Sequence, residues 1–410
     1  MHPAEPERSA HAPADRPGPG PALVVLLLAQ MAIGLLTMTL CIPSMQDWPT
    51  LFGATQAHVQ LTFSAYVAAY GGAQLVYGPL ADRLGRKRVL MGGLLLAAVG
   101  SALAMAANGL SALVLARVLQ GAGSAAGMVV GRALVQDFFT GPDRTRMMAY
   151  VGMTMGLCPP LAALIGGQMH VALGWRSNFA ILLVLVMLLM LATWRFLPDV
   201  RPAAWGMASW WRQASASYAQ LMGQRSFVLY ALILATTSAT AYTYFAGAPI
   251  VLKAYGVGPQ SMGWFIMAVP VPYVLGNVLT SRLIHRYGDR RLMLWGQIGT
   301  VGGLVLMLAL ALAGFKSALA LVVPLAIMGI GHGLLVPPTL SGAVGAVPAL
   351  AGTAAAFSGT LQQFCGAVGG YWVGLVEHDG NLQLSLLMLT MAMVALLAHA
   401  LLGRSGAWRD

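Results

Sequence analysis

The chain has 410 residues, of which 58% are hydrophobic and only 9% are charged, and its mean hydropathy is +0.74. A soluble protein of this size carries roughly 25% charged residues, so this composition excludes a water-soluble fold with a charged surface. The formal charge of +11 would suit nucleic-acid binding, but the cations gather at the ends of apolar runs, where membrane topology explains them. Cys41, Cys158 and Cys365 lie within apolar runs and show no metal-binding or disulfide spacing.

Residues 1–21 are polar and rich in proline and alanine, and no signal-peptide cleavage site follows them. We expect this segment to be a disordered cytoplasmic tail. Farther along the chain, apolar runs are long enough to span the hydrocarbon core, which takes about 20 residues. Twelve segments qualify: 22–43, 57–80, 88–107, 110–137, 145–169, 176–197, 226–250, 261–284, 290–314, 318–340, 351–375 and 382–402.

A polar stretch, residues 198–225, separates the first six segments from the last six. It contains Arg and Trp residues, so we expect a cytoplasmic amphipathic linker on the membrane surface. The chain is therefore predicted to be an all-α integral membrane protein with 12 transmembrane helices in two six-helix lobes, residues 22–197 and 226–402. Residues 403–410 are predicted to form a second cytoplasmic tail.

The cations indicate the orientation of the predicted spans. With the N-terminus in the cytoplasm, the outer side receives only Arg176, Lys253 and Lys316, and the other Lys and Arg residues outside the spans fall on the cytoplasmic side. Cytoplasmic loops of membrane proteins carry the excess of Lys and Arg. We expect a multi-pass protein of a bacterial-type inner membrane with both termini in the cytoplasm and no nucleic-acid partner.

A dense cluster of cations lies between the second and third spans, where residues 78–88 read Gly-Pro-Leu-Ala-Asp-Arg-Leu-Gly-Arg-Lys-Arg. A degenerate copy follows the eighth span, and it keeps Leu283, Arg286, Gly288, Arg290 and Arg291. Each copy follows the second span of a six-span half. Such a parallel repeat is typical of two-lobed transporters with a substrate site at the lobe interface, near mid-membrane.

These motifs resemble those of the major facilitator superfamily, over residues 22–402, and most of all the Bcr/CflA drug-resistance efflux family. Residues 78–87 are similar to the superfamily motif between spans two and three, and residues 117–121 to the fourth-span motif of proton-linked members. The fifth span resembles the antiporter motif through Gly152, Gly156, Pro159, Gly166 and Gly167. The likeness to Bcr/CflA proteins is carried by residues 60–66, 132–137, 174–179 and 247–249.

The chain departs from that family at two places. Members commonly carry an Asp in the first span where this chain has Thr39, and an Ala-Pro pair in the fifth span where it has Ala162 and Ala163. The missing acid removes the usual proton site and the usual basis for binding cationic drugs. Because the spans carry Arg117 and Arg132 but no deep acid, a neutral or anionic substrate is favoured.

The resemblance implies that Gly78, Asp82, Gly85, Arg86 and Asp137 form a gating cluster. In the outward-open state of the family, Asp82 is expected to face the N-terminus of the eleventh span, and Arg86 to pair with Asp137. Gly85 is well placed as a helix C-cap that permits a sharp turn. The alternative interpretation is an ordinary cluster of cations that only sets topology.

Three further residues lie where charge is costly. Arg117 and its motif partner Gln120 are expected to take part in coupling, the alternative being an arginine that binds carbonyl groups for packing. Arg132, nearer the cytoplasm, either reaches the interface or lines the cytoplasmic mouth. His332, in the glycine-rich tenth span, is a candidate proton carrier or a packed histidine.

The expected substrate cavity draws on aromatic residues with a few polar groups, which suits amphipathic ligands. Its candidate lining residues are Gln30, Thr37, Thr39, Tyr66, Tyr70, Tyr242, Tyr244, Trp264, Asn277, Gln363 and Trp372. The fifth-span glycines and prolines either seal the lobes against leak or only pack the helices.

We therefore predict a monomeric secondary transporter that exports a small amphipathic drug or metabolite by proton antiport, with protons and the lipid bilayer as its other partners and no cofactor or metal. The alternative is an importer or facilitator of an organic anion or nutrient, with Arg117 as the substrate clamp. An enzyme is not expected, because the spans hold no paired acids, histidine cluster or activated nucleophile. A non-transporting sensor is a further alternative, although the large soluble domain that such proteins often carry is missing from the sequence.

Overall fold

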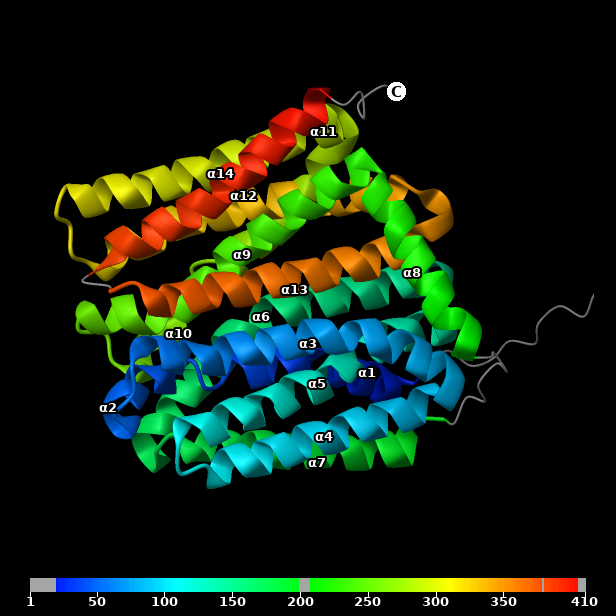
Figure 1. The fold of residues 1–410 in the computed structure, drawn as a ribbon, viewed down its shortest axis with the longest axis horizontal. Coiled ribbons are helices and arrows are strands. Elements are labelled where there is room, and N and C mark those ends of the chain that lie inside the picture. Colours follow the sequence, from blue (N-terminus) through cyan, green and yellow to red (C-terminus); the bar gives the residue numbers. More distant parts are fainter. Residues whose placement is uncertain (1–19, 199–206, 378–379, 405–410) are drawn as a thin grey trace, which may run out of the picture.

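A computed structural model describes residues 20–198, 207–377 and 380–404, and every element in these ranges is helical. The N-terminal lobe consists of α1 (Pro21–Thr39), α3 (Gln56–Leu84), α4 (Arg86–Ala106), α5 (Leu110–Phe138), α6 (Gly141–Leu173) and α7 (Arg176–Phe196). The C-terminal lobe consists of α9 (Arg225–Ala254), α10 (Pro259–Ile266), α11 (Pro270–Leu312), α12 (Ala318–Gly345), α13 (Ala351–Leu375) and α14 (Asn381–Arg404). The two lobes lie one above the other in Figure 1.

Nine helical runs of the described residues are long and apolar enough to cross a membrane. One of them, Pro259–Leu312, has 54 residues and would extend about 80 Å if straight, far more than a bilayer. Gly288, with φ 75°, kinks it and divides it into two crossings. The more polar helices α3 and α13, of 29 and 25 residues, bring the crossings to the predicted twelve.

The two ends of the helix bundle differ in charge, and we name them accordingly. The Arg-rich end, at the right of Figure 1, contains the turns at Gly85 and Gly288 with their flanking cations. Helix α8 (Met207–Gly223) also lies there and contacts α9 and α13. The opposite end, at the left, contains the short helix α2 (Trp48–Phe52) and α10.

Small residues let the helices of each lobe approach closely. A Cβ at Gly121 of α5 would collide with the backbone of Tyr66 in α3. In the C-terminal lobe, a Cβ at Gly333 of α12 would meet the Cα of Gly276 in α11 at 2.6 Å. Substituting these glycines would therefore force apart the helices that carry the central residues of each lobe.

Prolines explain the two places where helices end earlier than predicted. α1 stops at Thr39, because Pro43 has no N–H to offer the carbonyl of Thr39, and a 3₁₀ turn (Pro43–Gln46) follows. The eighth predicted span is broken between α10 and α11, because Pro270 leaves the carbonyl of Ile266 without its helical donor.

Parts of the predicted tails and linker lie outside the described residues: 1–19, 199–206 with Arg201 and Trp205, and 405–410. The predicted lobe and linker boundaries therefore remain predictions.

Candidate functional site

The predicted gating cluster comes together at the Arg-rich end. Gly85 caps α3 with a φ of 92°, and α4 begins at Arg86. Arg86 binds Asp82 of α3 at 2.6 Å, and its Nε lies 3.4 Å from Oδ2 of Asp137 in α5. Lys87 donates to the carbonyl oxygens of Trp194 and Leu197, both at 2.8 Å, where α7 ends.

All of these bonds lie inside the N-terminal lobe. The side chain of Asp82 is 64% exposed while it binds Arg86. At the start of α13, a Cβ added to Gly352 would meet nothing within 4 Å, so this helix end is open. The nearest neighbour of a Cβ at Gly78 is Val129, also of the N-terminal lobe. In this conformation the cluster therefore fastens helices of one lobe to each other.

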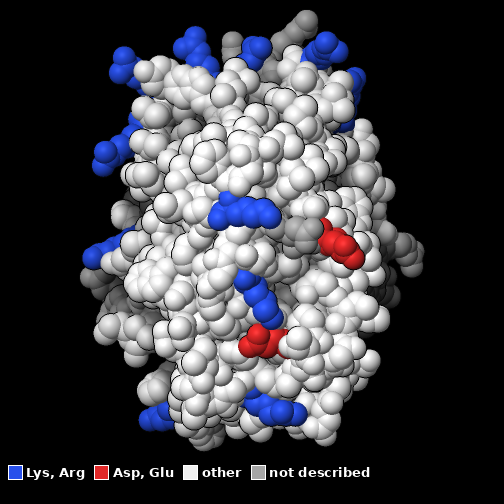
Figure 2. Space-filling view, turned by 90° about the vertical axis from the view of Figure 1, so that its left-hand side faces the viewer, with Lys and Arg blue, Asp and Glu red and all other residues white. Residues whose placement is uncertain are grey.

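At the opposite end, Gln46 and Asp47 of the N-terminal lobe bind the C-terminal lobe, Asp47 through Lys253. We call these three residues, together with His170, which binds Asp47 within the N-terminal lobe, the opposite-end clamp. Gln46 donates to the carbonyl oxygens of Pro249 (3.0 Å) and Val257. Lys253 Nζ donates to the carbonyl of Gln46 at 2.6 Å and lies 3.5 Å from Asp47 Oδ1. Asp47 Oδ2 also lies 2.9 Å from His170 Nε2. In Figure 2, which faces this end, a basic and an acidic side chain touch near the middle of a largely uncharged surface.

Contacts between the lobes continue from this end to mid-membrane along α3 and α13. Gln60 of α3 donates to the carbonyl of Ala246 at 2.8 Å, and Thr360 of α13 to that of Gly71 at 3.4 Å. Most residues of α3 are buried up to Gly71, whereas none from Gly72 to Leu80 is fully buried. The lobes therefore meet at the opposite end and separate towards the Arg-rich end.

Two of the four fifth-span glycines, Gly156 and Gly167, lie at the same contact. A Cβ at Gly167 would collide with the backbone of Pro259, and one at Gly156 with the side chain of Val274, both in the C-terminal lobe. Gly166 lies against the backbone of Leu40 in its own lobe, and a Cβ at Gly152 would meet nothing within 4 Å. Pro159 and Pro160 are buried.

Arg117 is completely buried in the N-terminal lobe. Its guanidinium donates to the carbonyl oxygens of Thr37 (2.8 Å), Met38 (3.5 Å) and Thr62 (3.3 Å), and it lies 4.2 Å from the centre of the Tyr66 ring. Thr37 and Met38 belong to the last turn of α1, whose carbonyl groups lack helical donors and attract a cation.

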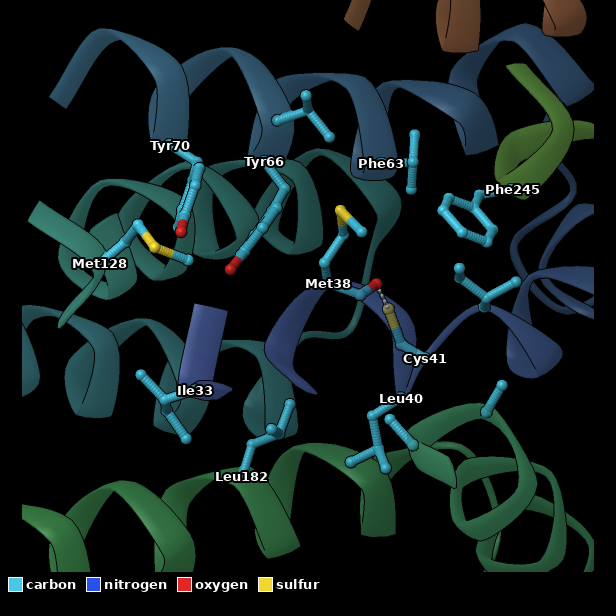
Figure 3. Close-up of a cluster of buried hydrophobic side chains, with 14 of the residues drawn as sticks. Ile33, Met38, Leu40, Cys41, Phe63, Tyr66, Tyr70, Met128, Leu182 and Phe245 are labelled. Carbon is cyan, nitrogen blue, oxygen red and sulfur yellow. Dashed lines mark hydrogen bonds between the residues drawn. The ribbon is translucent and has the colours of Figure 1, made fainter. Parts of the chain in front are cut away.

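Gln120 completes the surroundings of this guanidinium. Its Oε1 accepts from Arg117 at 2.9 Å, and its Nε2 donates to Ser101 at 2.8 Å. Neutral carbonyl and amide oxygens, with the Tyr66 ring, therefore surround the buried charge. Figure 3 shows the adjacent end of α1, where Met38 and Cys41 lie below Tyr66.

His332 lies inside the C-terminal lobe, with 3% of its surface exposed. Its Nε2 is 3.1 Å from the hydroxyl oxygen of Thr240 in α9. The flanking glycines bring the backbone of α12 against α11 on both sides, since Gly331 faces Gly296 and Gly333 faces Tyr273. The histidine is thus packed between three helices of the C-terminal lobe.

The predicted cavity residues fall into four groups. Gln30, Thr37, Thr39 and Tyr244 are buried, and they bond Thr193 or carbonyl groups of their own lobe. Residues from both lobes meet at the interface: the Tyr242 ring lies 6.2 Å from that of Phe63, and Gln363 packs against Gly71. Tyr66 and Tyr70 stack at 6.1 Å on the same side of α3, and Asn277 is half-buried beside Gly333.

Two predicted cavity tryptophans are exposed. Trp264 has 65% and Trp372 has 45% of its surface exposed. Trp372 follows Phe364 and Val368 at helical spacing, and both of those side chains are exposed as well. Such an apolar stripe is typical of a surface that faces lipid, which explains why Trp372 lies outside the lobe contact.

Two six-helix lobes in contact across the middle of a membrane define a secondary transporter. A family profile described as Major Facilitator Superfamily matches residues 14–370, and the chain belongs to this family of transporters, which are not enzymes. The chain is 28% identical over 380 residues to "Multidrug resistance protein D" of Escherichia coli, covering 92% of this chain and 94% of the relative. It is 28% identical over 390 residues to "Chloramphenicol resistance protein" of Pseudomonas aeruginosa, covering 92% and 89%.

Solved structures agree on the fold. A crystal structure of a peptide transporter in complex with alafosfalin superposes with a TM-score of 0.75 at 14% identity, covering 93% of each chain. The chain is thus a multi-pass membrane protein that acts on small molecules, and several relatives are drug-resistance proteins of bacteria.

Proposed function

We propose that the chain exports a small amphipathic drug or metabolite from the bacterial cytoplasm by proton antiport with alternating access. Relatives named for multidrug and chloramphenicol resistance support export. The fifth-span glycines support antiport, because Gly156 and Gly167 lie where the two lobes touch. The motifs shared with Bcr/CflA proteins point in the same direction.

The observation that carries this proposal is the asymmetry of the lobe interface. The lobes are joined at the opposite end, and they separate towards the Arg-rich end. The excess of cations supports placing the Arg-rich end, and with it both termini, on the cytoplasmic side. A carrier in this conformation is ready to receive its substrate from inside the cell, which is the first step of export.

Within this scheme, Asp82, Arg86 and Asp137 form the gate that closes the cytoplasmic side, and Gly78 and Gly85 shape it. Arg117 couples that movement to α1, because it binds the carbonyl groups at its end, and Gln120 holds Arg117 in place. His332 is the candidate proton carrier of the C-terminal lobe.

The alternative of an organic-anion importer with Arg117 as the clamp has less support. The guanidinium already donates to three backbone carbonyls and to Gln120, and it is completely buried. A substrate would have to displace these bonds, and the turn at the end of α1 would lose its donors.

Everted membrane vesicles test the proposed function. The vesicles are energised so that their interior is acidic, and a pH-sensitive dye reports the pH gradient. A panel of amphipathic compounds, beginning with chloramphenicol, is then added one compound at a time. We expect at least one compound to dissipate the gradient only when the intact protein is present, with empty-vector vesicles as the control. The result that would contradict export is that no compound dissipates the gradient, while cells with the protein accumulate more of a panel compound than cells without it. The protein would then be an importer.

A further inference from the structure

Arg132 is a charged residue of α5 whose side chain is exposed although it lies within a membrane-crossing helix. No ion pair or hydrogen bond in the described part of the chain involves it, whereas Arg86 and Arg117 are both paired. A cation at the centre of such a helix costs about 2.5–3.5 kcal/mol by insertion scales and is tolerated when it faces water or a ligand. Arg132 lies six residues before the end of α5. Arg132 therefore requires an explanation that packing does not give.

The neighbours of Arg132 place it between α1 and α3. On one side, Gly131 packs against Met31 of α1, and on the other, Val129 faces Gly78 of α3. One turn along α5 lies Met128, which Figure 3 shows beside the hydroxyl of Tyr70. Arg132 thus lies towards the Arg-rich end, where the lobes separate.

Arg132 forms no ion pair with an acidic residue of the described chain. The acidic residues of the described chain lie at helix ends or in loops: Asp47, Asp82, Asp137, Asp143, Asp289 and Glu377. Asp82 and Asp137, on the same end, both bind Arg86, and Asp143 lies in the first turn of α6. The positive charge of Arg132 is therefore not neutralised by an ion pair in the described part of the chain.

Aromatic rings follow along α3 in the direction of mid-membrane, where Tyr66 and Tyr70 are buried in this conformation. Tyr66 and Tyr70 stack on α3, and Tyr242 of α9 faces Phe63 across the lobe contact. An arginine fork binds a carboxylate or sulfonate in two places, and rings accept an aromatic scaffold. The combination suits a flat amphipathic molecule with one anionic group at its end.

We propose that Arg132 is the anion-binding residue of the substrate site and that the preferred substrates are aromatic or amphipathic compounds with a carboxylate or sulfonate. This inference rests on the proposed export function. The anionic group binds Arg132 on the cytoplasmic side, and the apolar part lies along Tyr70 towards the centre of the membrane.

The test uses two probes with the same aromatic scaffold, anilinonaphthalene sulfonate and the uncharged phenylnaphthylamine. Binding of the tritiated probes to the purified full-length protein in lipid nanodiscs is measured, and binding to empty nanodiscs is subtracted. Because a hydrogen bond to a charged group contributes about 1.5–3 kcal/mol, we expect the sulfonate to bind about tenfold or more tightly than the uncharged probe.

The variants separate charge from packing. Arg132→Ala should weaken sulfonate binding by about tenfold and leave the uncharged probe unchanged, and Arg132→Lys should keep part of the preference because it keeps the charge. Arg195→Ala is the matched control, since Arg195 is also exposed near the Arg-rich end but on α7. Unchanged binding of the uncharged probe also shows that the Ala variant is folded.

The outcomes distinguish this inference from the proposed function. Sulfonate binding that depends on Arg132, with no export of either probe from cells, supports the anion site and contradicts export of these compounds. Transport of the uncharged probe, with equal affinity for both probes in all variants, supports export and overturns the anion site. If neither probe binds in a manner that depends on Arg132, the anion site is also overturned.

Discussion

The Arg-rich end and the opposite end of the bundle use the same kind of bond for different purposes. At the Arg-rich end, Asp82 and Asp137 bind Arg86 within one lobe. At the opposite end, Asp47 and the carbonyl of Gln46 bind Lys253 of the other lobe. The end with many charges is thus the one that is open. The number of cations at an end reflects topology, and only the partners of each charge reveal which end is closed.

This difference also indicates how the two ends can exchange roles. The Lys253–Asp47 pair is about half-exposed on both sides, and such pairs contribute only about 0–1 kcal/mol. Gln46 is 4% exposed and bonds two carbonyl groups, so it contributes more. A clamp of a few modest bonds can open when substrate or protons shift the balance by a few kcal/mol.

The largest effect is expected for Gly167→Ala. The added Cβ would collide with the backbone of Pro259 and push α6 away from α10, at a cost of about 1–3 kcal/mol. We expect the opposite end to open and export to fall by about tenfold, measured as drug-dependent proton release in everted vesicles. Gly152→Ala is the control, because its Cβ meets nothing. Equal activity of the two variants would show that the fifth-span contact does not seal the lobes.

Asp82→Asn should have the next largest effect. The carboxylate is 64% exposed in this conformation, so expression and folding should be unaffected. If Asp82 closes the Arg-rich end in the other conformation, export should fall severalfold because that conformation loses an anion at a helix N-terminus. Arg83→Gln, a neighbouring change of charge, is the comparison. Export near the wild-type level in Asp82→Asn would contradict the gate.

Gln46→Ala tests the opposite end more gently. It removes the hydrogen bonds to Pro249 and Val257, each of which contributes about 0.5–1.5 kcal/mol. The distance between spin labels on α2 and α10, measured by double electron–electron resonance, should broaden towards longer values. Thr50→Ala, which loses only a bond to the nearby Asp47 carbonyl, should leave it unchanged. An unchanged distribution in Gln46→Ala would remove Gln46 from the clamp.

The smallest effect is expected for Lys253→Met. Salt screens exposed ion pairs, so the part of the change that arises from Asp47 should be seen at low ionic strength and fade at high salt. The same spin-label distance provides the measurement. A change that is independent of salt would assign the effect to the bond with the Gln46 carbonyl alone.

The helices could be predicted from the sequence, but the opposite-end clamp could not. The physical reason is that the partners in the clamp lie far apart along the chain. Hydropathy is local, so α13 was predicted from Ala351 to Leu375 as it is observed. The helix ends near Pro43 and Pro270 also depend on local sequence, namely on the two prolines. They were not predicted, because the apolar runs continue past these helix ends. In contrast, Lys253 reaches Gln46 across 207 positions and between lobes, and no pattern of spacing encodes such a pair.

Within the site, hydroxyl groups were the least predictable. Thr37 and Thr39 are polar residues in an apolar helix, so they were predicted to line the substrate cavity. In the structure, the hydroxyl of each donates to the carbonyl four residues earlier in its own helix. Asp137 was correctly placed beside Arg86 because the family motif carries both residues. Arg117 was expected to be deep, and its partners on α1 became apparent only when the end of that helix was known.

The bonds of Arg117 also bear on how the chain is assembled in the membrane. Until α1 offers its terminal carbonyl groups and α3 offers that of Thr62, the guanidinium on α5 has no acceptors outside its own helix. A lone α5 in lipid therefore pays the full penalty of an intramembrane cation. We expect α5 to be retained beside the insertion machinery until the first two crossings have been released, so that the order of synthesis becomes the order of packing.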